Sequence, residues 1–149
     1  MKLCSACLLG IKCRYDGKSM PNKKVLKLAK KEALIPVCPE QLGGLPTPRE
    51  WSELRDKQVV MKSGRDVTKN FEAGAKETLR IAKLLGIKEA VMKQRSPSCG
   101  CGQIYDGMFS GRVIKGDGVT TMLLKKNSIK VVSEEELQSK SFRFSKRCM

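Results

Sequence analysis

Seven cysteines are the residues of this chain best suited to chemistry, and they occur without a single histidine. They are Cys4, Cys7, Cys13, Cys38, Cys99, Cys101 and Cys148. Without imidazole, any metal site must be built mainly from thiolates, with carboxylates, hydroxyls or water as the remaining ligands. Sites rich in thiolate select zinc or iron–sulfur clusters. An odd number of cysteines also fits poorly with a closed set of disulfides.

Three of the cysteines follow short apolar runs that predict buried strands. The runs are residues 3–6, 34–37 and 89–93, and they lead to Cys7, Cys38 and Cys99 respectively. Ligands of open α/β sheets bind beyond the carboxyl ends of the strands. We therefore expect these three cysteines to meet in one crevice. Three thiolates there can hold a [4Fe–4S] cluster through three irons and leave the fourth iron open as a Lewis acid.

Two other interpretations of the cysteines remain open at this point. Cys4-x-x-Cys7 and Cys99-x-Cys101 can form a four-thiolate zinc site, which needs no catalysis. Alternatively, the cysteines are inert buried thiols. Cys13 and Cys148 have no assigned role in any of these interpretations, and Cys4 or Cys101 could supply a fourth thiolate to a cluster.

Helical patterns alternate with the strands along the chain. The expected helices are residues 23–32, 66–85, 120–126 and a short turn at 134–138, the further strands are 58–61 and 129–132, and residues 41–49 form a loop rich in Gly and Pro. This order predicts an α/β fold, a single-domain three-layer sandwich with a mostly parallel, Rossmann-like sheet. We expect residues 1–138 to form the domain and residues 139–149 to form a basic C-terminal tail.

Charge and location give broader expectations. The chain carries 30 Lys and Arg against 15 Asp and Glu, a formal net charge of +15. That excess favours a polyanionic partner, nucleic acid first, although a solvated basic surface would give the same count.

No apolar run is long enough for a membrane span and the start lacks a signal peptide, so we expect a cytoplasmic protein with reduced thiols.

Polar groups gather beside the cysteines in the sequence. They are Arg14, Tyr15 and Asp16 after Cys13, Glu40 after Cys38, Arg49 in the following loop, and Ser96 and Ser98 before Cys99. Each has a structural explanation: Asp16 belongs to an ordinary turn, and Arg49 can be a solvated charge. Their coincidence with three cysteine loops favours a functional site.

Seven motifs spread over most of the chain resemble those of the DUF523 family, whose characterised members are TudS-like thiouracil desulfurases and tRNA 4-thiouridine desulfidases. The motifs are SACLLG at 5–10, CRYDG at 13–17, PVCPE at 36–40, GGLPTPR at 43–49, DVT at 66–68, SPSCG at 96–100 and IYDG at 104–107. The resemblance implies a [4Fe–4S] cluster on Cys7, Cys38 and Cys99 with one open iron. It also implies a non-redox reaction in which water replaces the sulfur of a thiolated pyrimidine, and sulfide is released.

The reaction that the resemblance implies needs proton transfers, and the chain has no histidine for them. Glu40 and Asp16 are the candidate acid or base, Glu40 because it lies two residues after Cys38. Ser96 matches the first serine of the family motif and can relay a proton or orient the base.

The high positive charge favours thiolated tRNA over free thiouracil as the substrate, with the thiolated base extruded into the crevice. A zinc-stabilised RNA-binding module without catalysis is the alternative function. A carrier that delivers sulfur or a cluster is a third. The oligomeric state does not follow from the sequence.

Overall fold

A four-stranded parallel sheet forms the centre of the protein, whose computed structural model describes residues 1–137. The strand order is β2-β1-β5-β8, with β1 at Lys2–Ser5, β2 at Leu34–Val37, β5 at Glu89–Met92 and β8 at Lys130–Ser133. All three pairings are parallel. The prediction of an α/β fold with a mostly parallel sheet is therefore confirmed. The predicted basic tail and Cys148 lie outside the described residues.

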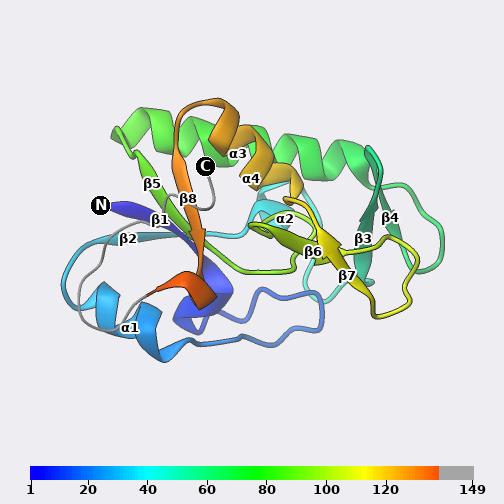
Figure 1. Ribbon diagram of the computed structural model, residues 1–149, viewed down its shortest axis with the longest axis horizontal. Helices are drawn as coiled ribbons and strands as arrows, with labels where there is room; N and C mark the ends of the chain where they lie inside the picture. The colour runs from blue at the N-terminus through cyan, green and yellow to red at the C-terminus, as the bar shows by residue number, and fades with distance from the viewer. Residues whose placement is uncertain (138–149) are drawn as a thin grey trace.

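Helices cover both faces of this sheet, as Figure 1 shows. Alternate residues of each strand point to opposite faces, so the two faces have separate cores. The core under α3 (Thr68–Leu85) and α4 (Val119–Lys126) includes Leu3, Ala82, Ala90, Leu124 and Val131. The core under α1 (Lys23–Ala29) includes Cys4, Val25, Leu28, Val91 and Val132. No helix of the described part combines the length and apolar character needed to cross a membrane.

The main helices begin and end close to their predicted positions. The side chain of Asn22 accepts the backbone N–H groups of Lys24 and Val25 and so caps α1. The longest predicted helix, residues 66–85, begins two residues later, because the carboxylate of Asp66 accepts the N–H of Thr68 from outside the helix. It ends at Gly86, which takes the left-handed conformation expected of a helix-terminating glycine.

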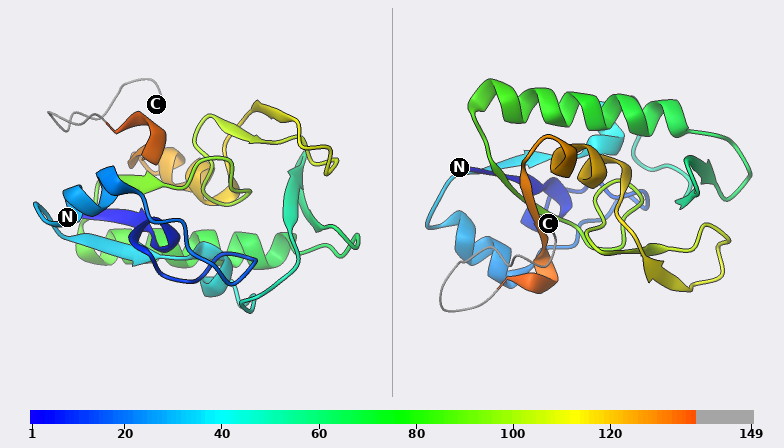
Figure 2. Two further views of the ribbon diagram at one scale, coloured as in Figure 1. Left: turned by 90° about the horizontal axis from the view of Figure 1, so that it is seen from below. Right: turned by 45° about the horizontal axis from the view of Figure 1, so that its top comes forward.

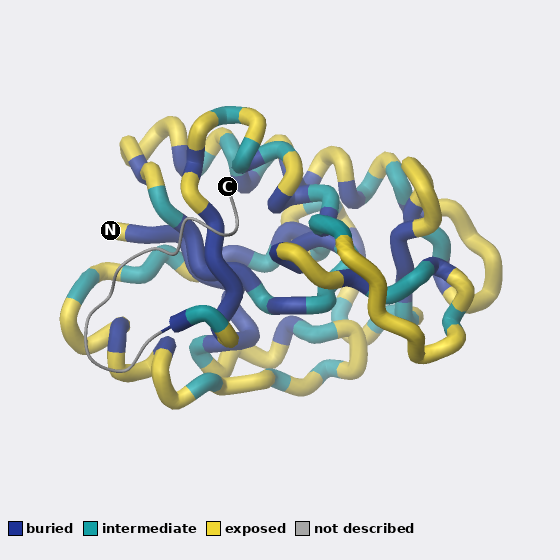
Figure 3. Tube along the Cα trace, viewed as in Figure 1, coloured by how far each residue is buried: buried dark blue, intermediate teal, exposed yellow. Residues whose placement is uncertain are grey.

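Two antiparallel hairpins lie outside the sheet. One joins β3 (Ser52–Arg55) to β4 (Gln58–Met61), and the other joins β6 (Gln103–Tyr105) to β7 (Val113–Lys115). Both views of Figure 2 place them at the end of the molecule away from the N-terminus. A third small core lies here, and β7 is exposed along its length (Figure 3). Of these strands the sequence predicted only β4, and it does not join the parallel sheet.

A short helix, α2 (Pro39–Leu42), occupies the start of the segment predicted as loop 41–49. It lies against α3 through two glycines. A Cβ on Gly43 would lie 2.8 Å from the carbonyl carbon of Asn70, and one on Gly74 would lie 2.8 Å from that of Pro39. The Asn70 side chain also donates to the Gly43 carbonyl at 2.8 Å. The backbones therefore touch directly, which fixes the chain just after Cys38.

Candidate active site

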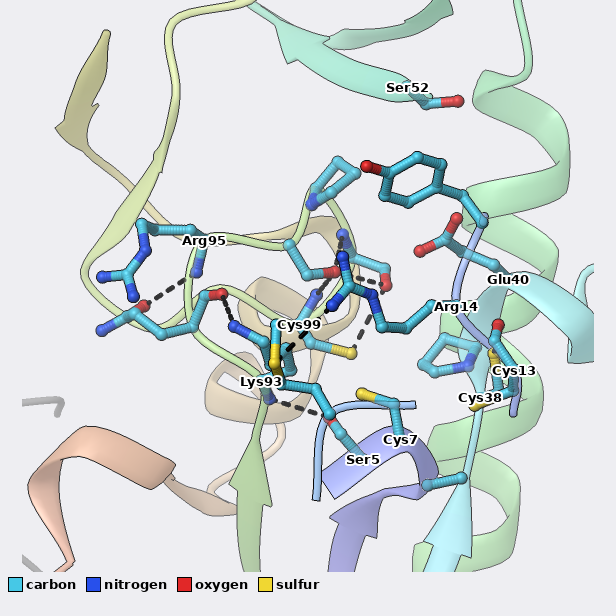
Figure 4. A pocket seen from close by; sticks show the side chains of 18 of the residues that line it. Ser5, Cys7, Cys13, Arg14, Cys38, Glu40, Ser52, Lys93, Arg95 and Cys99 are labelled. Carbon is cyan, nitrogen blue, oxygen red and sulfur yellow. Dashed lines mark hydrogen bonds between the residues drawn. The ribbon is translucent and has the colours of Figure 1, made fainter. Parts of the chain in front are cut away.

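One cavity of about 370 Å³ opens where β1, β2 and β5 end. Cys7 reaches it from the 3₁₀ turn Ala6–Leu9 that follows β1, Cys38 from the residue after β2, and Cys99 from the loop after β5. A fourth cysteine, Cys13, also lines it. Figure 4 shows Cys7, Cys13 and Cys38 on one side of this cavity. The parallel topology thus brings together cysteines that are far apart in sequence.

Of the other residues proposed from the sequence, Glu40 and Ser96 line the cavity and Asp16 does not. The carboxylate of Asp16 accepts the N–H of Lys18 at 3.0 Å and lies 3.4 Å from the guanidinium of Arg14. Arg14 does line the cavity. Asp16 is therefore placed to hold Arg14 rather than to reach a bound molecule.

Cys13 contacts two of the proposed cluster ligands. The thiol of Cys38 donates to the Cys13 carbonyl oxygen at 3.7 Å, and the Cys13 thiol is hydrogen-bonded to those of Cys38 and Cys7. The bond to Cys38 lowers the pKa of Cys13, but the bond to Cys7 and burial outweigh it and raise that pKa to about 11. The pKa of Cys38 is raised far above its ordinary value by the bond to Cys13 and by burial. Sequence reasoning missed Cys13, because no apolar run precedes it.

The loop around Cys99 is held by serine hydroxyls. The Ser96 Oγ accepts the N–H groups of Ser98 at 3.2 Å and of Cys99 at 3.1 Å. The Ser98 hydroxyl lies 3.2 Å from that of Ser96 and 3.4 Å from the Cys99 sulfur. Burial raises the pKa of the Cys99 thiol to about 12. Ser96 therefore fixes the backbone that presents Cys99, and Ser98 contacts the sulfur directly.

Arg49 connects the loops on the other side of the cavity. Its side chain is 2% exposed, so the solvated-charge interpretation is wrong. The Nε donates to Glu40 Oε1 at 3.0 Å, and Nη2 donates to the Cys13 carbonyl oxygen at 2.9 Å. One guanidinium thus orients the single carboxylate among the lining residues and holds the segment that carries Cys13.

Four basic side chains line the cavity, against this one carboxylate: Arg14, Arg49, Lys93 and Arg95. Lys93 Nζ lies 3.2 Å from Glu134 Oε1, and the other oxygen of Glu134 accepts the N–H of Gln94 at 2.8 Å. Arg95 pairs with Glu135 at 2.6 Å. Arg14 and Arg49 are paired as well, with Asp16 and Glu40, so each of the four cations has a carboxylate partner and the lining offers N–H donors to an anionic ligand or leaving group rather than an excess of positive charge.

An aromatic wall formed by Tyr15, Trp51 and Tyr105 closes part of the cavity. The rings of Trp51 and Tyr15 stack with centroids 6.4 Å apart, and Tyr105 meets Trp51 edge-on at 5.8 Å. Trp51 directly precedes β3 and Tyr105 ends β6, so the two hairpins bring their aromatics to the cavity. The wall offers an apolar surface of the kind that flat ring ligands contact.

The four-thiolate zinc site considered from the sequence does not form. Cys4 and Cys101 do not line the cavity; their thiols donate to the carbonyl oxygens of Ser5 and Val131. Within residues 1–137, no three His, Cys, Asp or Glu side chains are close enough to bind one metal ion. Cysteines distributed around a cavity instead suit a cluster, whose irons are bound by separate thiolates.

The comparisons with known proteins agree with this geometry. The model of the 2-thiouracil desulfurase family matches residues 3–136. The uncharacterised protein YbbK of Bacillus subtilis (strain 168) is 43% identical over 147 residues, which span 92% of this chain and 97% of that protein. A solved structure described as the [4Fe-4S]-dependent thiouracil desulfidase TudS superposes with a TM-score of 0.86 at 43% identity, covering 91% of each chain. The chain therefore belongs to the 2-thiouracil desulfurase family, as the DUF523-like motifs predict.

Proposed function

We propose that the protein is a [4Fe–4S]-dependent desulfidase that replaces the sulfur of a thiolated pyrimidine by oxygen. The balance is C=S + H₂O → C=O + H₂S, with no net oxidation or reduction. The observation that carries the proposal is the single cavity at which Cys7, Cys38 and Cys99 meet Glu40 and Ser96. The relative described as a [4Fe-4S]-dependent thiouracil desulfidase supports the same reaction.

Cys7, Cys38 and Cys99 would hold the cluster. When bound on three thiolates, the cluster supplies an open iron that binds the soft sulfur of the substrate and polarises the C=S bond. Burial and neighbouring thiols raise the pKa values of Cys38 and Cys99, so these two thiols are neutral in the cluster-free chain. Assembly of the cluster then releases their protons.

Glu40 is the proposed general base for the attacking water. Its carboxylate lines the cavity (Figure 4), and Arg49 holds one of its oxygens at 3.0 Å. The second oxygen is then available to accept a proton from water. Ser96 is the proposed relay, because its hydroxyl lies beside Ser98 in the loop of Cys99. Asp16 acts indirectly in this scheme, through its ion pair with Arg14.

The basic lining assists departure of the sulfur. A hydrosulfide leaves as an anion, and Lys93 and Arg14 lie in the same cavity. Positive charge that is already in place stabilises negative charge as it develops, without reorganisation at the moment of reaction. Lys93 is itself held by Glu134 at 3.2 Å.

For the substrate we propose 4-thiouridine in tRNA ahead of free thiouracil. The +15 charge supplies the phosphate contacts that a free base does not need. Helix α1 presents exposed lysines at 23, 24 and 27, Lys30 follows it directly, and the sequence of residues 139–149 contains four further basic residues. Residues 1–138 would form the catalytic domain, working in the cytoplasm, where thiols stay reduced. The thiolated base must be extruded to reach the cavity.

The test is anaerobic reconstitution followed by a turnover assay. Iron and acid-labile sulfide are counted per chain, and sulfide release is measured with 4-thiouracil and with tRNA that contains 4-thiouridine. We expect about four irons per chain and release of sulfide without an added reductant. Cys38→Ser should lose both iron and activity, whereas the matched control Cys148→Ser should keep them. A wild-type chain that holds four irons and releases no sulfide from either substrate refutes the proposal.

A further inference from the structure

The buried carboxylate of Glu53, in β3, takes no part in the proposed reaction. The residue is 1% exposed and does not line the cavity. One oxygen, Oε1, accepts the backbone N–H groups of Gly107 at 3.1 Å and Phe109 at 3.0 Å. The other oxygen is buried without a partner within residues 1–137. Glutamate is rarely buried so completely, and a half-satisfied carboxylate costs stability, so the two bonds that it makes need an explanation.

The two N–H groups belong to the loop between β6 and β7, whose backbone is strained. Gly107 has a φ of 85° and Phe109 a φ of 54°. A bulky residue in the left-handed region is uncommon and persists where its surroundings hold it. β3 lies against β6, as Figure 1 shows, and Arg55 Nε of β3 also donates to the Gly107 carbonyl oxygen at 2.9 Å. The first hairpin therefore sets the conformation of the loop in the second.

This conformation places the ring of Phe109 against Trp51. The two rings meet edge-on, with centroids 5.6 Å apart and an interplanar angle of 82°. Tyr105 meets the same indole edge-on at 5.8 Å, and Tyr15 stacks with it at 6.4 Å. Three rings thus hold the indole, and contacts of this kind favour a defined ring orientation. Phe109 does not line the cavity, whereas Trp51 does, so Phe109 reaches the site through the indole.

We propose that Glu53 is a positioning residue for the substrate ring. Its carboxylate fixes the loop that carries Phe109, and the Phe109 ring fixes the indole of Trp51. The aromatic wall, with Trp51 at its centre, then holds the flat ring of the thiolated pyrimidine. The cysteines follow strands of the central sheet and stand outside this series of contacts. Loss of Glu53 should therefore weaken ring binding and spare the chemical step. The inference rests on the proposed function for the identity of the ring.

The first test follows the mobility of Trp51, the one tryptophan of the chain, and needs no turnover. In the full-length chain, Glu53→Leu removes the acceptor, whereas Glu53→Gln keeps an oxygen acceptor. We expect lower fluorescence anisotropy and stronger quenching by acrylamide in Glu53→Leu, and wild-type values in Glu53→Gln. Asp117→Ala is the matched control. The Asp117 carboxylate also accepts a loop N–H, that of Gly102 at 2.8 Å, and it does not line the cavity, so Trp51 should be unchanged.

The second test measures sulfide release from 4-thiouracil by the cluster-loaded chain. Glu53→Leu should raise KM about 3- to 10-fold, as loss of one aromatic contact does. Its kcat and iron content should match those of the wild type, because a rise in KM at constant kcat marks binding that substrate and transition state share. Glu53→Gln should restore KM. If kcat, iron content and melting temperature fall together while KM stays constant, the role of Glu53 is merely structural and the inference is overturned.

Phe109→Leu provides a second variant for the case in which Glu53→Leu folds poorly. It keeps the carboxylate and both N–H groups and removes only the aromatic ring. It should lower the anisotropy of Trp51 and raise KM as much as Glu53→Leu does. Because both residues act through one series of contacts, the double variant should have the KM of Glu53→Leu alone. Wild-type anisotropy and KM in Phe109→Leu contradict the inference.

Failure of the proposed function would look different. A wild-type chain that holds its cluster and releases no sulfide contradicts that function and leaves 4-thiouracil unconsumed. The dissociation constant of 4-thiouracil, measured by equilibrium dialysis, then takes the place of KM. It should rise about 3- to 10-fold in Glu53→Leu and Phe109→Leu. An unchanged constant, or a wild-type chain that does not bind the ring, overturns the role of Glu53.

Discussion

Gly74→Ala should damage both the fold and the site, although alanine is normally the better helix residue. An alanine Cβ at Gly74 would lie 2.8 Å from the carbonyl carbon of Pro39 and 3.2 Å from the backbone nitrogen of Gly43. Carbon atoms in contact ordinarily lie about 3.5–4.0 Å apart. The Cβ would lie closer still to the Pro39 carbonyl oxygen, so the two helices must separate by at least about 1 Å, because backbone atoms cannot rotate aside as a side chain does.

Two opposing terms set the magnitude for Gly74→Ala. Exchanging a helical glycine for alanine stabilises by about 1 kcal/mol. Overpacking at a closed contact costs about 1–3 kcal/mol. We expect a net loss of up to about 2 kcal/mol in unfolding free energy. Because α2 carries Glu40 and directly follows Cys38, a displacement of about 1 Å should also lower kcat by about 100-fold.

Denaturant unfolding, iron content and turnover together test this prediction. Ala73→Gly is the matched control, because Ala73 is exposed on the same helix. It should lose about 1 kcal/mol through helix propensity alone and keep its iron and its kcat. A Gly74→Ala variant that is as stable as the wild type and fully active would falsify the close backbone contact and its role in placing the site.

Three further predictions concern the buried cysteines and Arg49. Cys7→Ala should lose iron. Cys13→Ala should keep about four irons per chain and an absorption spectrum similar to that of the wild type. Loss of iron from Cys13→Ala would mean that the ligand set is different. Arg49→Lys should lower stability by about 1–3 kcal/mol and should also lower kcat. Arginine bonds Glu40 through Nε and the Cys13 carbonyl through Nη2, and the single nitrogen of lysine cannot occupy both positions. Wild-type kcat with unchanged unfolding would contradict this prediction. In the cluster-free chain, burial raises the pKa values of Cys4 and Cys99 from 9.0 to about 12. The contribution of these neutral thiols to the free energy of unfolding is therefore complete below pH 9. It falls as pH rises toward 12, by about 1.4 kcal/mol per pH unit for each thiol. Unfolding free energies measured at pH 8 and pH 10 check this, and equal values would show that the thiols are not buried.

The sequence predicted the parallel sheet and three of the cavity cysteines for one physical reason. Buried parallel strands are short apolar runs, and their carboxyl ends share an edge, so the position of Cys7, Cys38 and Cys99 follows from local pattern plus topology. Cys13 follows no such run. Its place depends on hydrogen bonds to Arg49 and Cys38, which are distant in sequence.

Apart from β4, the strands of the hairpins escaped prediction because they lack a regular pattern. β3 has the sequence SELR, and one oxygen of its buried glutamate accepts two backbone N–H groups of the distant 107–109 loop. β7 is exposed throughout. The contact between Gly43 and Gly74 likewise joins segments that no local pattern relates. Asp16 was proposed for the site from its closeness in sequence to Cys13, but its carboxylate faces Lys18 and Arg14.

The separation of sheet and hairpins has a consequence for how the protein can change. Cys7, Cys38 and Cys99 follow strands of the central sheet, whereas Trp51, Ser52 and Tyr105 come from the hairpins. A substitution in β3 or β6 can alter the shape offered to the ring without moving the ends of β1, β2 or β5. Variation in the hairpins is thus a route to new substrate preferences in descendants or engineered libraries, with the sulfur-handling groups inherited intact.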